Sequence, residues 1–304
     1  MLTKEIITEA LMGLQDRICK GLEALDGTAT FREDKWERPG GGGGRTRVIQ
    51  KGGVIEKGGV NFSSVHGEMP KQLLKTLKME VMETEETLDF FATGVSIVLH
   101  PESPMTPITH MNVRYFEISN GVWWFGGGID LTPIYVDIDL AKDFHQKMKA
   151  VCDRFHPSYY ERFKKWCDDY FYIKHRKETR GVGGIFFDRL GLEEPLNKEK
   201  LFEFIIAVGD TFVDAYRTQV NATRPLFYGA QELHWQALRR ARYVEYNLVW
   251  DRGTQFGLQT DGRTESILMS MPPMAAWEYD YQPAEGSAEA ETLQYLQKGI
   301  DWIH

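Results

Sequence analysis

Three segments with the residue pattern of β-strands follow one another between residues 92 and 125. Residues 92–100 and 109–118 are rich in β-branched and aromatic residues, and prolines interrupt the chain between them. Asn120-Gly121 is a strong hairpin signal, and residues 122–125 form the third segment. Because short turns join strands in antiparallel order, the sequence predicts an antiparallel sheet in this part of the chain.

Apolar residues spaced three and four apart indicate that helices surround these strands. We expect helices over residues 2–25, from Asp139 to Phe155, from Pro157 to Phe171, and over residues 199–219, 229–241 and 287–302. Residues 242–250, 255–259 and 266–271 have the pattern of further strands, separated by turns. The sequence therefore predicts one α+β domain spanning residues 1–304, with a large, mostly antiparallel β-sheet flanked by α-helices on both faces.

The stretch from residue 30 to residue 59 has the least regular pattern. Residues 40–44 are five consecutive glycines, and glycine pairs follow at 52–53 and 58–59. A linker between domains is one interpretation. Apolar residues recur through the stretch, which favours packing on a core instead: Trp36, Val48, Ile49, Val54 and Ile55.

Composition and charge limit the class of protein. The chain has a formal net charge of −8, so we expect no nucleic-acid partner. Its three cysteines, Cys19, Cys152 and Cys167, form no C-x-x-C motif and favour a reducing compartment over a disulfide framework. No apolar run approaches the roughly 20 residues of a membrane span, and the N-terminal residues resemble no targeting segment. These features predict a soluble cytoplasmic protein.

Polar and apolar residues alternate along the first two predicted strands, which gives each strand two different faces. One face carries Ser96, Val98 and His100 on the first strand, and His110, Asn112 and Arg114 on the second. The other face is apolar: Val95, Ile97 and Leu99, then Met111, Val113 and Tyr115. If the two strands pair, the polar sets line one side of the sheet, which is then either a solvated face or a binding site.

Three glycines, Gly126-Gly127-Gly128, directly precede Ile129 and Asp130. Glycines at such a place permit a sharp bend or a close approach of the backbone to a ligand. A phosphate-binding loop would need a helix immediately afterwards, but Thr132-Pro133 and another strand-like run follow. The phosphate-loop interpretation is therefore weak.

Two arginines lie beside other glycine-rich turns. Arg180 precedes Gly181-Val182-Gly183-Gly184, and Arg263 follows Asp261-Gly262. The planar guanidinium matches a carboxylate, and each charged hydrogen bond contributes about 1.5–3 kcal/mol. Each arginine is either an ordinary surface residue or part of an anion site.

Four histidines are candidates for metal ligands: His100, His110, His145 and His175. The first two fall on predicted strands, and none belongs to a His-Glu-x-x-His pair. Binding of a divalent metal would require them to converge in space, which their spacing does not establish. Taken singly, each is more often a structural histidine.

Several longer motifs complete the sequence analysis. They are WERPGGGGG at 36–44, EKGGVN at 56–61, WWFGGG at 123–128 with DLTP at 130–133, FKKWCD at 163–168, RGVGG at 180–184, YVEYNLVWDRGT at 243–254 and ESILMSMP at 265–272. Together these motifs resemble the oxygen-dependent coproporphyrinogen III oxidase family. The similarity extends from about residue 30 to the C-terminus.

The resemblance implies a homodimer with a contact segment at about 243–278. It implies an oxidoreductase of haem biosynthesis, and of chlorophyll biosynthesis in some organisms. The implied reaction converts two propionates of coproporphyrinogen III into vinyl groups, giving protoporphyrinogen IX, with O2 as oxidant and CO2 and H2O2 as products. It implies no organic cofactor, and a divalent metal in some members.

The resemblance also implies roles for individual residues. Substrate contacts are implied for Ser96, Asn112, Val113 and Arg114, and for Asp261, Gly262 and Arg263. The catalytic set would be His110 as general acid or base, Asp130 as partner of the pyrrole nitrogens, and Arg114 and Arg180 as propionate ligands. The metal ligands of some members would match His100, His110, His145 and His175. Asp261 departs from the family pattern, because a carboxylate beside Arg263 would weaken its grip on a propionate.

Two other classes of protein remain possible from the residues. A tetrapyrrole carrier would use the same arginines without consuming oxygen. A histidine-ligated metal oxygenase would act on a different anion and would lose activity after chelation. A nucleotide-binding protein is disfavoured because the phosphate-loop fingerprint is absent.

Overall fold

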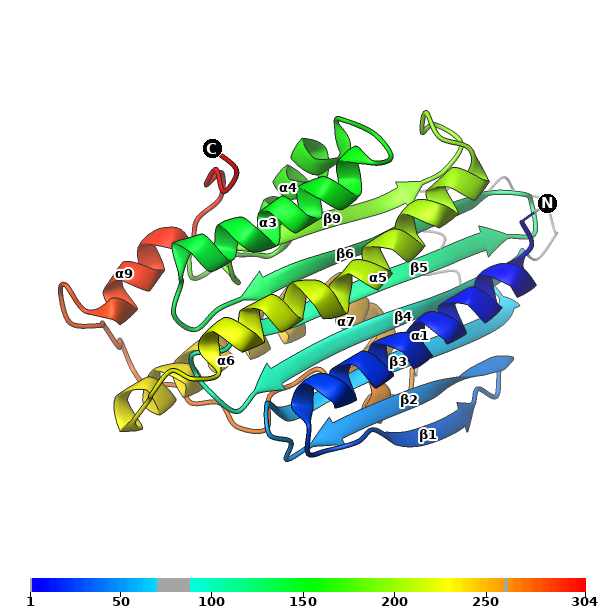
Figure 1. The fold of residues 1–304 in the computed structure, drawn as a ribbon. Coiled ribbons are helices and arrows are strands. Elements are labelled where there is room, and N and C mark those ends of the chain that lie inside the picture. Colours follow the sequence, from blue (N-terminus) through cyan, green and yellow to red (C-terminus); the bar gives the residue numbers. More distant parts are fainter. Residues whose placement is uncertain (1, 70–87, 260–261) are drawn as a thin grey trace.

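The computed structural model describes residues 2–69, 88–259 and 262–304. At its centre is a seven-stranded antiparallel sheet with the order β1-β2-β3-β4-β5-β6-β9 (Figure 1). The strands are β1 (Arg32–Glu37), β2 (Gly42–Gln50), β3 (Ile55–Glu68), β4 (Asp89–Pro101), β5 (Ile108–Ile118), β6 (Trp123–Thr132) and β9 (Gly183–Leu190). Only the β6–β9 pair joins strands that are not consecutive in the sequence.

Helices cover both faces of the sheet. In Figure 1, α1, α3 and α5 lie in front of the sheet and α7 lies behind it. The helices are α1 (Lys4–Asp26), α3 (Ile138–Asp153), α4 (Tyr159–Tyr170), α5 (Lys198–Thr223), α6 (Ala230–Val249), α7 (Arg252–Gln259), α8 (Thr264–Leu268) and α9 (Ala288–Tyr295). A short hairpin of β7 (Tyr172–Ile173) and β8 (Glu178–Thr179) lies apart from the main sheet. The predicted α+β architecture is confirmed.

The apolar face of β4 and β5 packs against the helix layer of α1, α3 and α5. Its alternate residues are all fully buried in one hydrophobic cluster with those helices: Val95, Ile97, Leu99, Met111, Val113 and Tyr115. The two strands pair in the register that the alternation requires, with Ile97 opposite Met111. The polar residues between them therefore face away from this core.

Two glycines allow α1 and α5 to pack closely across the sheet. A Cβ atom on Gly209 would lie 2.5 Å from Leu14 Cδ2, and one on Gly21 would lie 2.8 Å from Val213 Cγ1. Both distances are shorter than any ordinary carbon–carbon contact. The absence of a side chain at these positions thus sets the spacing of the two longest helices on the core side.

A buried carboxylate joins the end of α1 to the turn between β2 and β3. The side chain of Asp26 accepts hydrogen bonds from the backbone N–H groups of Ala29, Gly53, Val54 and Ile55, at 2.9–3.0 Å. Burial alone would raise the pKa of Asp26, but these hydrogen bonds hold it well below its usual range. The ionised carboxylate takes the place of water as the hydrogen-bond acceptor of these four N–H groups. It thereby holds the end of α1 against the turn between β2 and β3.

The C-terminal third differs from the prediction. Residues 242–249 belong to the continuous helix α6, residues 255–259 lie in α7, and residues 266–268 lie in α8, so none of the three segments is a strand as predicted. The aromatic and β-branched residues of this region resemble a strand pattern. However, Tyr243, Tyr246 and Asn247 are buried at helical spacing, and this packing determines the structure.

Further differences concern glycines and helix ends. The glycine-rich residues 30–59 contain β1, β2 and the start of β3, so the linker interpretation is wrong. Residues 126–128 lie within β6, and the pairing of β6 with β9 shifts register between Phe125 and Gly127. Helix α3 is capped by Asp137, whose side chain accepts from the N–H of Leu140, and the last helix ends at Tyr295.

Candidate active site

The polar face of β4, β5 and β6 forms one continuous surface. Asn112 lies opposite Ser96, and His110 lies opposite Asp130 on the next strand. Arg114 lies one pleat further along β5, opposite Gly126. This face is turned toward α6, α7 and α8, so the predicted polar set does gather on one side of the sheet.

Asp130 is the most enclosed acid of this surface, with 2% of its area exposed. Arg180 Nη2 donates to both of its carboxylate oxygens, at 3.0 and 2.8 Å, and His110 Nδ1 lies 2.7 Å from Oδ1. Burial alone would raise the pKa of Asp130, but the Arg180 charge and the His110 hydrogen bond hold it below its usual value. Asp130 is therefore a carboxylate whose hydrogen-bonding capacity is largely used.

Arg180 is held in a cage of three aromatic rings. Its guanidinium carbon lies 4.1 Å from the centroid of Phe171, 4.5 Å from that of Tyr243 and 4.9 Å from that of Tyr246. Only 2% of the residue is exposed. Burial opposes its charge, yet the negative charge of Asp130 raises the pKa of Arg180 further above its ordinary value. A desolvated cation above aromatic faces gains cation–π energy in addition to its ion pair.

The predicted role of Arg180 as a propionate ligand stays a prediction, and these contacts bear on it. A propionate ligand needs a guanidinium that the substrate can reach, whereas Arg180 is enclosed and is bonded to Asp130 through the same nitrogen. The resemblance also assigned Asp130 to the pyrrole nitrogens. In this arrangement Asp130 points at His110 and Arg180 instead.

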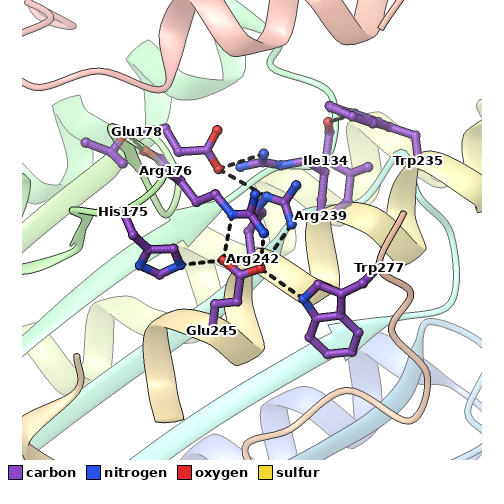
Figure 2. Close-up of polar contacts among 11 residues, drawn as sticks. Ile134, His175, Arg176, Glu178, Trp235, Arg239, Arg242, Glu245 and Trp277 are labelled. Atoms are coloured by element: carbon purple, nitrogen blue, oxygen red, sulfur yellow. Dashed lines mark hydrogen bonds and ion pairs between the residues drawn. The ribbon is translucent and has the colours of Figure 1, made fainter. Parts of the chain in front are cut away.

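A second polar network joins the β7–β8 hairpin to α6 (Figure 2). Glu178, in the β7–β8 hairpin, accepts from Arg239 of α6 at 2.9 Å. Glu245 of α6 accepts from His175 and Arg176 of the same hairpin, both at 2.7 Å. Burial alone would raise the pKa of Glu245, but its hydrogen bonds lower it to about 2. The hairpin that leads into Arg180 is thus fixed to the helix that carries two of the three rings.

The imidazole of His110 makes two contacts. Its Nδ1 forms a hydrogen bond with Asp130, and its ring lies edge-to-face with Phe171, with centroids 5.8 Å apart. Because Asp130 is ionised, it acts as the acceptor, so Nδ1 carries the proton of this hydrogen bond; whenever the ring is neutral, the lone pair is on Nε2. The carboxylate therefore sets the tautomer of the histidine. A side-chain exposure of 18% lets His110 act at the surface of the site.

Arg114 is oriented by two neighbours on the sheet. Its Nη1 donates to Asn112 Oδ1 at 2.9 Å and its Nη2 donates to Asp188 of β9 at 2.8 Å. Gly126 lies beneath it, and a Cβ atom there would lie 3.0 Å from Arg114 Nε. With 37% of its side chain exposed, Arg114 is the cation of the set best placed to meet an anionic ligand.

Three predicted substrate positions have different surroundings. Ser96 lies beside Asn112 on the polar face. Val113 points into the helix-covered core and is fully buried, so its side chain cannot contact a substrate on the polar face. Gly262 precedes α8, where Arg263 forms an ion pair with Asp34 of β1. Asp261 lies outside the described residues.

The four candidate metal ligands do not come together. They lie on β4, β5, α3 and the β7–β8 turn. His100 Nε2 donates to Ser270 O and His145 Nε2 to Val182 O, and burial lowers the pKa of each to about 3. In the described ranges, no three His, Cys, Asp or Glu side chains are grouped so that they could hold a metal ion. The four rings lie in different parts of the fold, and their role as metal ligands stays a prediction.

Sequence reasoning missed the residues that orient the site. Asp188 follows two aromatic residues in β9, a strand that was not predicted. Tyr243 and Tyr246 were placed on a strand, where their spacing of three would not bring them to one face. In a helix, residues three apart lie on the same face. Recognising the helical period would therefore have placed Tyr243 and Tyr246 side by side.

Comparison with known proteins gives one consistent result. The family described as coproporphyrinogen III oxidase matches residues 6–302. The chain belongs to this family. It is 50% identical to an oxygen-dependent coproporphyrinogen-III oxidase of Parasynechococcus marenigrum (strain WH8102), over 96% of this chain and 85% of that protein. Relatives of the same name from Synechococcus sp. strains CC9605 and CC9902 are each 49% identical, over 99% and 96% of this chain and 88% and 86% of theirs.

The role of Arg180 can be tested through stability. We expect Arg180→Met to lower the free energy of unfolding by about 3–5 kcal/mol, because the buried carboxylate of Asp130 would lose the cation that balances its charge. The matched control is Arg217→Met, which removes an exposed ion pair with Asp214 and should cost at most about 1 kcal/mol. Urea denaturation measures both. Native stability of Arg180→Met, together with a raised KM, would instead assign Arg180 to the substrate.

Proposed function

We propose that this protein catalyses the oxygen-dependent oxidative decarboxylation of coproporphyrinogen III. Two propionates become vinyl groups, giving protoporphyrinogen IX for tetrapyrrole biosynthesis. For each propionic acid side chain, one O2 is consumed, and one CO2 and one H2O2 are released. Carbon, hydrogen and oxygen balance in this equation, and the two electrons lost by the substrate reduce O2. Family membership over nearly the whole chain carries this proposal.

The polar sheet face supplies the groups that such a reaction needs. A proton must move at the propionate chain as its carboxylate leaves, and His110 Nε2 is the free nitrogen for that transfer. Asp130 acts by holding the His110 tautomer and by stabilising the charged ring when the proton is taken. Arg180 keeps Asp130 ionised within the aromatic cage.

Arg114 is proposed to hold the reacting propionate, with Ser96 and Asn112 beside it. Arginine can bind a carboxylate through two parallel hydrogen bonds, which fixes orientation as well as position. Correct orientation contributes about 7–11 kcal/mol to catalysis in the best cases. Asp188 limits the rotation of the guanidinium and so acts as a positioning residue.

We propose O2 as the only oxidant, with no organic cofactor. The names of the relatives, which include the words oxygen-dependent, support O2 as the oxidant. We further propose a cytoplasmic location, since the three cysteines are buried free thiols that suit a reducing compartment. None of the helices in the described ranges is long and apolar enough to cross a membrane.

The activity is tested by incubating the protein with coproporphyrinogen III in the presence and absence of O2. We expect protoporphyrinogen IX, CO2 and H2O2 only with O2. Binding of the tetrapyrrole without O2 uptake would make the protein a carrier instead. Loss of activity on chelation, restored by a divalent metal, would favour a metal oxygenase.

Substitution of His110 tests the proton-transfer step. We expect His110→Ala to lower kcat by about 100- to 10,000-fold while substrate still binds, because the general acid–base group is lost. His66→Ala, at an exposed histidine on β3, is the matched control and should keep its kcat. A His110→Ala variant with nearly normal kcat would remove this residue from the mechanism.

We also propose a homodimer that uses the segment at about 243–278. Large apolar side chains of this segment are exposed in the monomer, including Leu248 (46%), Val249 (49%), Trp277 (54%) and Met274 (70%). Exposed apolar patches of this kind favour association.

The dimer proposal predicts the behaviour of a charged variant. Leu248→Asp combined with Val249→Asp should give monomers at concentrations where the unmodified protein is dimeric, as measured by light scattering after gel filtration. Leu192→Asp, at an apolar side chain that is 80% exposed outside the segment, is the control. A double variant that remains dimeric would contradict this contact surface.

A further inference from the structure

Beyond Arg114, the face of the sheet that carries the candidate site changes from polar to apolar. The next side chain of β5 on this face is Phe116, and Ala92 of β4 and Trp124 of β6 lie opposite it. These three residues pack on a small hydrophobic cluster that is separate from the core between the sheet and α1, α3 and α5. Each of them is partly exposed. An apolar surface therefore borders the arginine that is proposed to hold the reacting propionate.

Three aromatic rings form this surface, which we call the aromatic strip: Phe90, Phe116 and Trp124. Phe116 stacks on Trp124, with centroids 4.4 Å apart, and on Phe90, with centroids 5.9 Å apart. Their planes differ by 21° and 9°, so the rings are nearly parallel. Rings that already pack on one another lose little conformational freedom when a ligand binds. The strip is thus a preformed apolar surface across β4, β5 and β6.

A second arginine lies at the far end of the strip. Arg38 follows β1, and its guanidinium carbon lies 5.8 Å from the centroid of Phe90. Its Nη1 donates to His66 O at 3.1 Å, and no carboxylate of the described residues forms an ion pair with it. Phe90 lies four residues before Gly94, the partner of Arg114, so the two rows of the sheet are about 13 Å apart. The strip therefore has a cation at each end.

This order of groups matches one kind of ligand. A porphyrinogen has an apolar macrocycle with methyl groups on its rim, and its propionates extend from different pyrroles. It can cover the rings and place a carboxylate at each arginine at the same time, whereas an anion with a single carboxylate would engage one arginine only. An exposed apolar patch beside charged groups is typical of a binding site.

We propose that Phe116, Trp124 and Arg38 bind the parts of coproporphyrinogen III that do not react. The macrocycle and its methyl groups lie against the two rings, and Arg38 holds a second propionate while Arg114 holds the reacting one. An octacarboxylate porphyrinogen carries acetates in place of the methyl groups, and burying these charges on an apolar surface is costly. The strip therefore selects for methyl groups. This inference rests on the proposed function, because the ligand is the proposed substrate.

Two neighbouring tryptophans test the contact with the macrocycle. Trp124 lies on the strip, whereas Trp123 points to the opposite face and packs on the core beside Phe125. Dissociation constants of coproporphyrinogen III and uroporphyrinogen III, which is the octacarboxylate, are measured by equilibrium dialysis without O2. We expect Trp124→Ala to weaken binding of coproporphyrinogen III about tenfold and binding of uroporphyrinogen III less than about threefold, so the preference narrows. Trp123→Ala should leave the preference unchanged.

Equal weakening of both ligands in Trp124→Ala would mean that the indole only supports the fold. Unchanged binding of coproporphyrinogen III in that variant would also overturn the proposal, because the strip would then not meet the substrate. Failure of the unmodified protein to bind either porphyrinogen would reject the proposed function itself, and so is distinguishable.

Arg38→Gln is an independent test, and it decides the matter if Trp124→Ala does not fold. Glutamine keeps a donor for His66 O but removes the charge, so we expect binding of coproporphyrinogen III to weaken about tenfold. The difference should shrink at high salt, because salt screens a partly exposed charge. Arg32→Gln, at an exposed arginine of β1, is the matched control and should bind normally. Normal binding in Arg38→Gln would overturn the proposed second propionate contact.

Discussion

The ion pair between Arg180 and Asp130 is almost completely buried beside an otherwise polar sheet face. Taking two charges out of water costs several kcal/mol per ion, and the pair is stable only because geometry and additional partners compensate for that cost. Here the additional partners are three aromatic rings on the guanidinium and His110 on the carboxylate. The pair in turn orients His110 through Asp130, and we propose that the proton chemistry at the surface of the site depends on this buried contact.

One sheet serves two purposes because its faces differ residue by residue. On one face, alternate apolar residues of β4 and β5 are buried against α1, α3 and α5. This packing holds the strands in place. On the other face the same strands present polar side chains in fixed register. Glycines on this polar face, such as Gly94 and Gly126, have no side chain to cover their polar neighbours. Groups placed on packed strands are held more precisely than groups on loops, which suits a reaction that needs defined orientation.

Local patterns predicted the parts of this structure that depend on neighbours in sequence. The alternation in residues 92–118 gave the pairing of β4 with β5 and the side on which His110, Asn112 and Arg114 lie. The same alternation could not predict that Arg180 pairs with Asp130. Arg180 comes 50 residues later in the sequence, and its position depends on a hairpin that is bonded to α6. Tyr243 and Tyr246 are residue types that are common in strands. Because they lie in α6 instead, both rings are buried against the Arg180 guanidinium. For the four candidate histidines, sequence spacing could not establish whether they converge, because their separation follows from the packing of elements that are distant in the sequence.

The central claim is that Asp130, held ionised by Arg180, places the proton of neutral His110 on Nδ1. Nitrogen-15 NMR of the histidine side chains distinguishes the two neutral tautomers, and comparison with His110→Gln assigns the signal. For the substrate-free protein, at a pH where the ring is neutral, the account predicts protonated Nδ1 and unprotonated Nε2. A neutral His110 with its proton on Nε2 would contradict it, because Asp130 would then not be the acceptor that orients the ring.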